Sequence, residues 1–452
     1  MNNILVLGAG RVARPLLRYL LARGDARVVA ASLQASPGVE RLLESHPRGA
    51  FLRVDATDAA VLRPLVLEAD AVVGLLPSAL NTGVARLCVA ERRPFVNTSY
   101  TPPEMLELDE EAHRNGVLLL NEVGLDPGID HMSAVRMIRR VRAAGGTVER
   151  FMSCCGGLPA PDANTNPWGY KFSWHPRGVL LAGLQPARFV RGGTTVEISG
   201  PELFEHRWRY EVEELGTFEV YPNRDATAYV EPYRLEGAEG FFRGTIRYPG
   251  WCETLKAVAD LGLLDLEERS LPQGTTWADL ASAADRGGTG AAAERVARIL
   301  GVDPDTQVIA RLEWAGLLSD RPIGGRSAAP LDLLAERLQK LMFYQRGERD
   351  LVVLKHTLTA AFPDGSTQIL TSRLVATGDP WGDQAMAQTV GLPAAIATDR
   401  IVSGKVTATG VQIPVLPEIA EPVLDELENH GFAFRESSLT MVPGPLDPPD
   451  RR

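Results

Sequence analysis

Cysteine is scarce in this sequence. The 452 residues contain four cysteines, at positions 88, 154, 155 and 252. Their spacing matches neither a set of metal ligands nor a disulfide framework. We therefore expect reduced thiols, a cytoplasmic protein and no bound metal.

Long apolar runs and an excess of basic charge are also missing. No apolar run reaches the length of a membrane span, and the first residues carry no charged leader, apolar core or cleavage site. The 47 basic and 57 acidic residues give a formal net charge of −10, and no basic block stands out. A membrane protein and a nucleic-acid binder are therefore not expected. The length and the 45% hydrophobic content predict a globular protein of two or three domains.

A glycine-rich turn stands near the start of the chain. Residues 3–7 form an apolar run, and positions 8–13 read Gly-Ala-Gly-Arg-Val-Ala before a helical pattern. In this G-x-G-x-x-A pattern, Gly8 allows a tight turn, Gly10 lets the backbone approach a pyrophosphate, and Ala13 permits close packing of helix on strand. A tight turn without a ligand is the alternative, but the position between a first strand and a helix favours dinucleotide binding.

Apolar runs then alternate with helical patterns up to residue 120. Further strands are expected at residues 27–32, 51–54, 71–76, 94–97 and 116–120. Six parallel strands with intervening helices make a doubly wound sheet, the Rossmann arrangement of the α/β class. Ligands of such sheets lie at the carboxyl ends of the strands.

The stretch after the sixth expected strand reads Asn-Glu-Val-Gly-Leu-Asp-Pro-Gly-Ile-Asp-His-Met, at positions 121–132. Its glycines and proline predict a shaped loop, followed by a helix over about 131–144. Asp126 in this loop is a candidate for general acid–base chemistry or for orienting a water; the alternative is an aspartate that only shapes its turn. Asp130 is expected to cap the helix. His131 is more typical of a hydrogen-bonded structural histidine than of a metal ligand.

The pattern changes after residue 145. A strand is expected at 147–155, a Gly/Pro/Asn-rich loop at 156–178, β-type segments near 188–199, 217–221 and 243–248, helical spacing over 251–345, a hairpin turn at 363–366 and a helix at 384–390. This order predicts a mixed α/β domain that carries a helical insertion. The expected domains are a dinucleotide-binding Rossmann domain at 1–128, a mixed α/β domain for substrate binding and dimerisation at 129–250 and 346–380, a helical domain at 251–345, a C-terminal segment at 381–440 that can return to the Rossmann domain, and a flexible tail at 441–452.

Eight segments between residue 4 and about 410 occur in the order found in one known family. They are residues 8–15, Thr98-Ser99-Tyr100, residues 121–132, Cys-Gly-Gly-Leu-Pro-Ala-Pro at 155–161, Gly-Tyr-Lys-Phe-Ser-Trp at 169–174, Tyr-Pro-Asn-Arg-Asp at 221–225, Arg-Gly-Thr-Ile-Arg-Tyr at 243–248 and Glu-Arg-Asp at 348–350. In these segments the chain resembles the glutamate-forming saccharopine dehydrogenases (saccharopine reductases). The match is loose between residues 267 and 307.

This resemblance implies a nicotinamide-linked oxidation of the secondary amine saccharopine by a homodimeric enzyme. Saccharopine, NADP(+) and water would give L-glutamate, 2-aminoadipate 6-semialdehyde and NADPH, reversibly and within lysine metabolism. Two rival interpretations stay open from the sequence. A carboxy-polyamine (carboxynorspermidine-like) dehydrogenase would need fewer carboxylate-binding groups, and a non-catalytic dinucleotide-sensing protein would not need Asp126 and Tyr100.

The resemblance also implies roles for individual residues. The catalytic candidates are Asp126, Tyr100 and Cys155. The cofactor-binding candidates are Gly8, Gly10, Arg11, Val12, Ala13, Ser32, Asp55, Leu75, Thr98, Ser99, Leu125 and Asp126. The substrate-binding candidates are Ser99, Tyr100, Asp126, Trp174, Arg224, Thr245 and Arg247. Arg224 and Arg247 can each pair with a substrate carboxylate through two parallel hydrogen bonds; surface ion pairing is the alternative.

The sequence departs from this family at the end of the second expected strand. Ala31-Ser32-Leu33 stands where family members carry an arginine that binds the 2′-phosphate of NADP, and His175 stands where a serine commonly follows the tryptophan. No carboxylate at residues 32–34 would repel a phosphate. Ser32 can donate a hydrogen bond, and Arg11 is close enough in a βαβ turn to supply charge. We therefore expect a modest preference for NADP, with NAD use also feasible.

Overall fold

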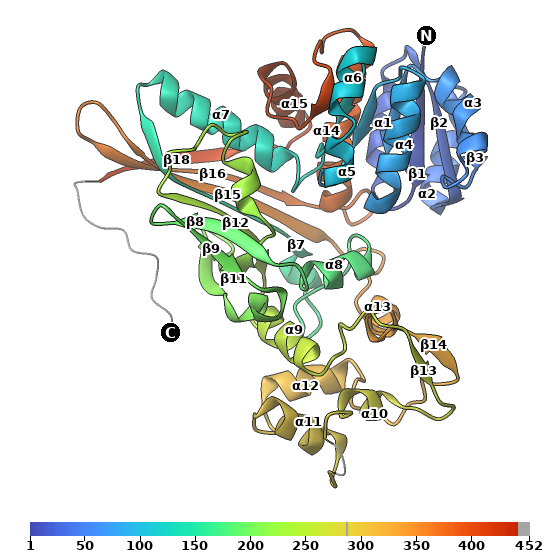
Figure 1. Cartoon of the computed structure of the whole chain (residues 1–452), viewed down its shortest axis with the longest axis vertical. Helices are drawn as coiled ribbons and strands as arrows, with labels where there is room; N and C mark the ends of the chain where they lie inside the picture. The colour runs from blue at the N-terminus through green and yellow to red at the C-terminus, as the bar shows by residue number, and fades with distance from the viewer. Residues whose placement is uncertain (286–287, 442–452) are drawn as a thin grey trace. The chain divides into compact units, whose positions relative to one another are not determined.

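The chain folds into two compact units, shown in the computed structural model of Figure 1. The structure describes residues 1–285 and 288–441. Unit 1 contains residues 1–148, 354–356 and 360–439, and unit 2 contains residues 149–353 and 357–359 together with those from 440 onward. The tail expected to be flexible, after residue 441, lies outside the described residues. The finer division into Rossmann, substrate-binding and helical domains stays a prediction.

A parallel sheet forms the core of unit 1, with the strand order β17-β6-β5-β4-β1-β2-β3. Its strands are β1 (Asn2–Ala9), β2 (Ala26–Ala35), β3 (Gly49–Arg53), β4 (Ala71–Gly74), β5 (Phe95–Asn97), β6 (Leu118–Leu120) and β17 (Gly410–Gln412). All neighbours in this order pair in parallel. The first six strands are those predicted from the sequence. The seventh comes from the C-terminal segment and extends the sheet beside β6.

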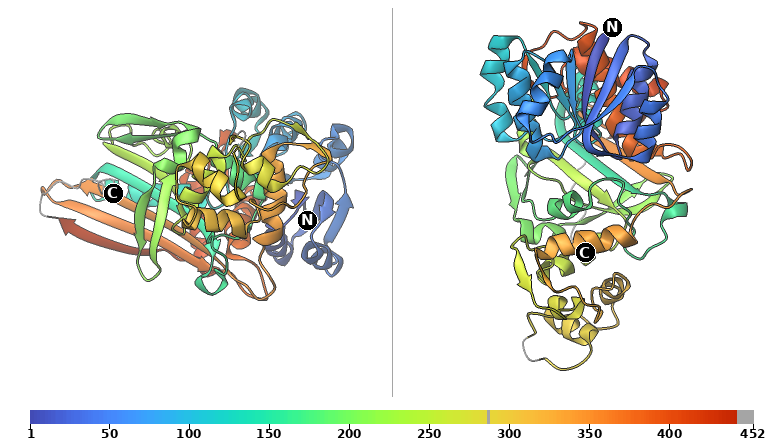
Figure 2. Two further views of the ribbon diagram at one scale, coloured as in Figure 1. Left: turned by 90° about the horizontal axis from the view of Figure 1, so that it is seen from below. Right: turned by 90° about the vertical axis from the view of Figure 1, so that its right-hand side faces the viewer.

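Helices lie on both faces of this sheet (Figure 1; Figure 2, right). The helices of unit 1 are α1 (Ala13–Ala22), α2 (Pro37–Glu44), α3 (Ala59–Glu68), α4 (Ser78–Ala90), α5 (Pro103–Leu106), α6 (Asp109–Asn115), α7 (Ile129–Ala143), α14 (Ala385–Val402) and α15 (Pro417–Asn429). Successive strand side chains point to opposite faces, so Leu5 and Leu7 of β1 share one face. They join an apolar cluster with Phe95 of β5, Leu62 of α3 and Val84 of α4.

Helix α14 packs against α1 and is longer than the sequence predicts. The predicted helix ended at residue 390, because Gly391 and Pro393 follow and both disfavour a helix interior. The structure keeps both residues inside the helix. A Cβ at position 391 would lie 2.8 Å from the carbonyl oxygen of Val12, so glycine permits a close approach between the two helices.

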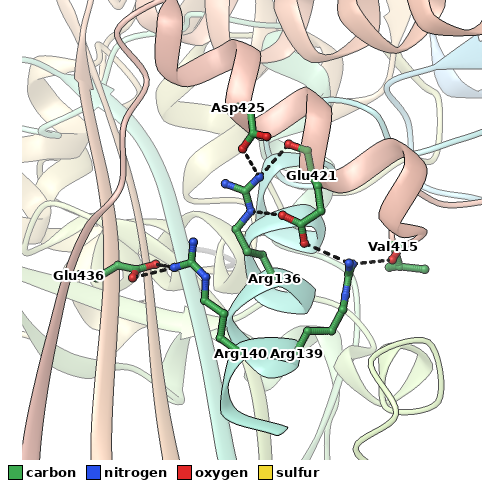
Figure 3. Close-up of polar contacts among 7 residues, drawn as sticks. All are labelled: Arg136, Arg139, Arg140, Val415, Glu421, Asp425 and Glu436. Atoms are coloured by element: carbon green, nitrogen blue, oxygen red, sulfur yellow. Dashed lines mark hydrogen bonds and ion pairs between the residues drawn. The ribbon is translucent and has the colours of Figure 1, made fainter. Parts of the chain in front are cut away.

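Arginines of α7 bind acidic groups of α15 (Figure 3). Arg136 donates hydrogen bonds to the carboxylate of Glu421 at 2.5 Å, to the carbonyl oxygen of Glu421 at 2.7 Å and to the carboxylate of Asp425 at 2.6 Å. Arg139 donates to the second carboxylate oxygen of Glu421 at 3.0 Å. These bonds tie the C-terminal helix to the helix that follows the Asp126 loop.

A hairpin turn precedes β16 (Thr367–Thr377), whose neighbour in unit 1 is β18 (Arg435–Met441). In the turn, the amide of Phe362 donates to the carbonyl oxygen of Ser366 at 2.9 Å. The hairpin predicted from Pro-Asp-Gly-Ser is therefore confirmed. Arg140 of α7 pairs with Glu436 of β18 at 2.9 Å (Figure 3).

Unit 2 is built on a mixed sheet with the strand order β10-β11-β12-β7-β15, and β8 and β9 pair beside β12. The strands are β7 (Thr147–Pro159), β8 (Ala187–Arg191), β9 (Thr194–Ile198), β10 (Trp208–Val212), β11 (Gly216–Pro222), β12 (Gly240–Arg247) and β15 (Asp350–Ala361). Strand β12 runs parallel to β7 and antiparallel to β11 and β8. The sequence predicted β7, β8, β9, β11 and β12 directly and β15 through the hairpin turn at 363–366, but it did not predict β10.

Strand β7 runs past the glycines that were expected to end it. The predicted loop began at residue 156, whereas the strand continues to Pro159. A Cβ at Gly156 would lie 2.6 Å from the carbonyl oxygen of Ile246, so glycine lets β12 approach closely at this point. The chain then makes a short 3-10 turn, Pro161–Ala163, before α8 (Pro176–Ala182).

The stretch with helical spacing forms helices together with one small sheet. The helices are α9 (Trp251–Asp260), α10 (Trp277–Ala281), α11 (Ala292–Leu300), α12 (Gln307–Trp314) and α13 (Pro330–Leu341). Strand β13 (Arg269–Leu271) pairs with β14 (Arg326–Ala328), which the spacing did not predict. Across residues 1–285 and 288–441, no helix has both the length and the apolar character that crossing a membrane requires.

Candidate active site

The glycine turn between β1 and α1 has the shape of a pyrophosphate cradle. A Cβ at Gly8 would lie 2.6 Å from the carbonyl oxygen of Leu75, which shows how closely the turn passes the end of β4. Gly10 is exposed, and a Cβ there would meet nothing within 4 Å, so its backbone is open to a ligand. Val12 precedes α1 and makes no side-chain cap, so the helix start keeps amides that an anion can bind. These residues fit a dinucleotide.

Two basic residues, Arg11 in this turn and Arg53 at the end of β3, lie on the cofactor-binding edge expected for this sheet. Ser32 of β2 and Arg53 of β3 are paired in register, so their side chains project from the same face of the sheet. Arg53 and Arg11 are both exposed. Within the described residues, no ion pair engages Arg53. Arg14, by contrast, is held by Asp383 at 2.5 Å.

The other cofactor candidates follow successive strands at the same edge of the sheet. Asp55 comes after β3 and is exposed, and its carboxylate accepts hydrogen bonds from the following turn. Leu75 follows β4, and its amide donates to the carbonyl oxygen of Leu7 in β1 at 2.7 Å. Thr98 and Ser99 follow β5, and Leu125 lies in the loop after β6. The structure thus gathers them along the carboxyl edge, as the sequence predicts for this fold.

The loop after β6 is closed by two glycines. The amide of Gly124 donates to the carbonyl oxygen of Pro127 at 2.9 Å, and the amide of Ile129 donates to the carbonyl oxygen of Gly124 at 2.9 Å. Gly128 has a φ of 145°, and a Cβ there would lie 2.1 Å from the Gly124 oxygen, so only glycine fits. Asp126 is held between the glycines with a half-buried side chain.

Two of the predicted catalytic residues meet in unit 1. The hydroxyl of Tyr100 donates a hydrogen bond to Oδ1 of Asp126 at 2.8 Å. Buried amides position the two chain segments: Nδ2 of Asn97 donates to Oδ1 of Asn121 at 2.6 Å, and Oδ1 of Asn97 accepts from the amide of Ser99 at 2.9 Å. The ends of β5 and β6 therefore present a phenol and a carboxylate as one pair.

The Asp126 loop also contains a buried carboxylate, on Glu122. Its Oε1 accepts from the amide of Thr101 at 2.9 Å and from the Thr101 hydroxyl at 2.7 Å, and its Oε2 lies 2.8 Å from Nε2 of His131. Burial alone would raise the pKa of Glu122, but the hydrogen bonds and the charge of its partners hold that pKa below its usual value. Glu122 and His131 are both fully enclosed.

The start of α7 differs from the prediction. The helix begins at Ile129, two residues earlier than predicted, and Gly128 precedes it. Asp130 therefore lies in the first turn, where its carboxylate accepts from the amide of Gly128 at 2.6 Å. It satisfies an amide at the helix start from inside the helix rather than as the cap residue. The predicted structural role of His131 is confirmed by its bond to Glu122.

A second group of candidates forms a row across three strands of unit 2. Tyr221 of β11 pairs in register with Thr245 of β12, which pairs in register with Cys155 of β7. Arg247 stands two residues beyond Thr245 and so shares its face of the sheet. Cys154 points to the opposite face and joins an apolar cluster, as expected of a small buried hydrophobic side chain.

Arg247 is buried in an aromatic enclosure. Its guanidinium lies 5.0 Å from the ring centre of Tyr170 and 5.6 Å from that of Trp251, and Nη1 donates to the carbonyl oxygen of Ile246 at 2.8 Å. Burial raises the pKa of the Tyr170 and Tyr221 hydroxyls, and the charge of Arg247 opposes this rise. No carboxylate of the described chain pairs with this guanidinium, and its Nε has no hydrogen-bond partner there. A buried cation in this state is suited to an anionic ligand.

The remaining substrate candidates lie elsewhere in unit 2. Arg224 follows β11 with a left-handed φ of 54° and a half-buried side chain. Trp174 is 38% exposed, and its ring covers Gly178. Trp168 is buried instead, and its indole donates to the carbonyl oxygen of Arg311 at 2.9 Å, which is a packing role.

Metal-binding side chains do not gather anywhere in the described chain. No group of three or more His, Cys, Asp or Glu side chains within it could hold a metal ion. The four cysteines are all buried, and none of them forms a disulfide.

Sequence reasoning missed four residues of these sites. Arg53 could have been found from strand alternation, which places it beside Ser32. Tyr170 lies in one of the recognised motifs and Trp251 begins a helix. The sequence around them gives no sign that both rings pack against Arg247. Glu122 gave no local signal, because its partners stand 21 and 9 residues away along the chain.

Comparison with known domains identifies the chain. The saccharopine dehydrogenase NADP binding domain matches residues 4–120, and the saccharopine dehydrogenase C-terminal domain matches residues 124–432. The chain belongs to the saccharopine dehydrogenase family. The first match contains the glycine turn, and the second begins at the Asp126 loop.

Members of the saccharopine dehydrogenase family resemble the chain over nearly its whole length. Saccharopine dehydrogenase (NADP(+), L-glutamate-forming) of Schizosaccharomyces pombe is 35% identical over 446 residues, covering 96% of this chain and 99% of that protein. The solved apo structure of saccharopine dehydrogenase (L-Glu forming) from Saccharomyces cerevisiae has a TM-score of 0.85 and 35% identity, covering 97% of this chain and all of that one. Mitochondrial alpha-aminoadipic semialdehyde synthase of Bos taurus is 33% identical over 97% of this chain, which matches 48% of that longer protein. The predicted family and fold are confirmed.

Proposed function

We propose that this chain is an NADP-dependent, L-glutamate-forming saccharopine dehydrogenase. It oxidises saccharopine, with NADP(+) and water, to L-glutamate, 2-aminoadipate 6-semialdehyde, NADPH and a proton, and the reaction is reversible. The observation that carries the proposal is the Tyr100–Asp126 pair at the carboxyl edge of a dinucleotide-binding sheet. This reaction requires both hydride transfer to a nicotinamide and proton transfer at the substrate nitrogen and at water.

Bound NADP(+) supplies the hydride acceptor, and the chain supplies groups that hold and move protons. Loss of hydride from the secondary amine leaves a carbon–nitrogen double bond in the substrate, which water must attack. The carboxylate of Asp126 accepts a proton from that water. The hydroxyl of Tyr100 keeps the carboxylate oriented through its 2.8 Å bond. When the carbon–nitrogen bond breaks, the hydroxyl gives its proton to the departing amine nitrogen and takes back the proton that Asp126 removed from water, so both residues return to their starting state. We assign Cys155 a supporting part in proton transfer.

The cofactor subsite is formed by the glycine turn after β1, by Ser32 in the second half of β2 and by Arg53 at the end of β3. The backbone around Gly8 and Gly10 receives the pyrophosphate. Ser32 donates a hydrogen bond to the 2′-phosphate, and Arg11 contributes positive charge. We add Arg53 to this subsite, because it is exposed and shares a sheet face with Ser32.

The substrate subsite uses the buried cation of unit 2. Saccharopine carries three carboxylates, so arginines that bind carboxylates through two hydrogen bonds suit it. Arg247 takes one carboxylate inside its aromatic enclosure, and Arg224 takes another. We keep Ser99, Thr245 and Trp174 as further substrate contacts. We also propose that the protein is cytoplasmic and forms a homodimer. Light scattering of the purified protein can test the dimer.

Product analysis tests this function. The purified protein, incubated with saccharopine and NADP(+), should form glutamate and an aldehyde in equal amounts, measured by mass spectrometry after the aldehyde is trapped. A carboxylated polyamine offered under the same conditions should give neither product. Turnover of the polyamine without turnover of saccharopine would replace this proposal with the rival enzyme.

A further inference from the structure

Glu122 joins the two chain segments that bear the Tyr100–Asp126 pair. One oxygen of its carboxylate accepts two hydrogen bonds from Thr101, which follows Tyr100. The other oxygen bonds to His131 at the start of α7, on the far side of the Asp126 loop. The carboxylate therefore spans from the segment after β5 to the helix after the loop, and all three bonds are between 2.7 and 2.9 Å.

The backbone at this position is unfavourable for the residue it carries. Glu122 has a φ of 62°, in the left-handed region that favours glycine. A glutamate there strains the backbone, and a buried carboxylate adds a desolvation cost. Glycine would avoid both costs and could adopt the same backbone conformation. Strain of this kind persists where surrounding contacts determine the geometry, and it concentrates at functional sites.

We propose that Glu122 is a positioning residue for the reaction: its carboxylate holds Thr101 and His131 together so that the neighbouring Tyr100 and Asp126 stay hydrogen bonded. This inference rests on the roles proposed above for Tyr100 and Asp126. Glu122 itself does not exchange a proton with the substrate. It acts through the Tyr100–Asp126 bond, and its replacement therefore produces the same defect as loss of that bond.

The test uses Glu122→Gly, because glycine adopts a φ of 62° without strain and leaves the backbone free to fold. We expect kcat to fall about 10-fold or more, with the NADP dissociation constant unchanged within about 2-fold. The acidic limb of the kcat/KM profile should move to higher pH, since an Asp126 carboxylate without its hydrogen bond is less stabilised in the charged form. Tyr100→Phe should move the limb in the same direction.

A double-mutant cycle separates positioning from a general loss of structure. Because Glu122→Gly and Tyr100→Phe remove the same bond, the double variant should be no more than about 2-fold slower than Tyr100→Phe alone. Losses that multiply would overturn the proposal. Glu122→Gln keeps an oxygen for both Thr101 bonds and should retain at least about a third of wild-type kcat. A 10-fold loss in Glu122→Gln would also overturn it, and this holds even if Glu122→Gly does not fold.

Ser133→Ala is the matched control. Ser133 is buried on the same helix. Its Oγ donates to the carbonyl oxygen of Ile129 at 2.6 Å and lies 2.7 Å from Nε2 of His356, so its bonds run within α7 and to β15 and do not involve the Thr101–Glu122–His131 bridge. This variant should lower the melting temperature but keep kcat and the pH profile. If Tyr100→Phe and Asp126→Asn are themselves fully active, the proposed chemistry fails. If they lose activity and Glu122→Gly does not, only the positioning role fails.

Discussion

The hydroxyl of Tyr100 donates a 2.8 Å hydrogen bond to the carboxylate of Asp126. The two residues are 26 positions apart and follow different strands, yet both strands end at the carboxyl edge of one parallel sheet. Asp126 is half-buried between two glycines, and only glycine fits at position 128. The two groups therefore lie within hydrogen-bond distance of each other, as proton transfer between them requires.

Replacing the carboxylate without changing its size should remove catalysis but not folding. Asp126→Asn keeps a group that can accept the Tyr100 hydrogen bond and removes the proton-accepting charge. We expect kcat and kcat/KM for saccharopine to fall together, by about 100-fold or more. Steady-state kinetics and thermal melting should be measured on the same preparation. A variant that melts earlier but turns over normally would assign Asp126 to shaping the turn.

Replacing either arginine proposed to bind the substrate should impair the use of saccharopine and leave cofactor binding unchanged. Arg247→Gln and Arg224→Ala each remove one charge-assisted partner of a substrate carboxylate. Each should reduce the transition-state stabilisation calculated from kcat/KM by about 2–4 kcal/mol. The NADP dissociation constant, followed by fluorescence titration, should hardly change. Wild-type saccharopine kinetics in either variant would remove that arginine from the subsite.

Preference for NADP should depend on the arginines at the ends of β1 and β3. Arg11→Ala and Arg53→Ala should each weaken NADP binding by about 10-fold and spare NAD, since only NADP carries the 2′-phosphate. Calorimetric titration of both cofactors measures this directly. Arg63→Ala is the control for net charge, because Arg63 lies on α3 and pairs with Glu91 at 2.6 Å. Equal effects on NAD and NADP would contradict the assignment, as would a native preference for NAD.

Acid should remove the stability that the Glu122 carboxylate provides. The pKa of Glu122 is held below its usual value of 4.5 in the folded chain. A depressed pKa stabilises the fold above the unfolded-state pKa, and this contribution disappears as the pH falls through the folded-state pKa. The melting temperature of the native chain should therefore exceed that of Glu122→Gln at neutral pH, and the difference should shrink below about pH 4.5. A difference that is constant with pH would show that the charge is not responsible.

The arginines of α7 should contribute unequally to stability (Figure 3). The Arg136 side chain is 15% exposed and makes three bonds to α15, so Arg136→Ala should destabilise the fold by about 1–3 kcal/mol. The Arg140 side chain is 58% exposed and pairs with one carboxylate. Arg140→Ala should cost less than about 0.5 kcal/mol. Thermal melting of both variants checks this order, and equal shifts would refute it.

Local patterns and distant contacts explain what the sequence could and could not predict. Six of the seven strands of the Rossmann sheet and the loop bearing Asp126 follow from apolar runs and turn residues that are neighbours in the chain. The length of α14 did not follow, because the close approach of Gly391 to Val12, almost 380 residues earlier, exists only in the folded chain. The part played by Glu122 was hidden for the same reason. Glu122 acts through hydrogen bonds to Thr101 and His131, and these residues come together only in the folded chain.

The most direct test of the central claim is the saccharopine-dependent reduction of NADP, followed by the absorbance of the reduced nicotinamide. The native protein should reduce NADP when saccharopine is added, and more efficiently than it reduces NAD. Asp126→Asn should reduce NADP at about a hundredth of that rate or less under the same conditions. Absence of turnover in the native protein, or equal rates in the native protein and Asp126→Asn, would contradict the account.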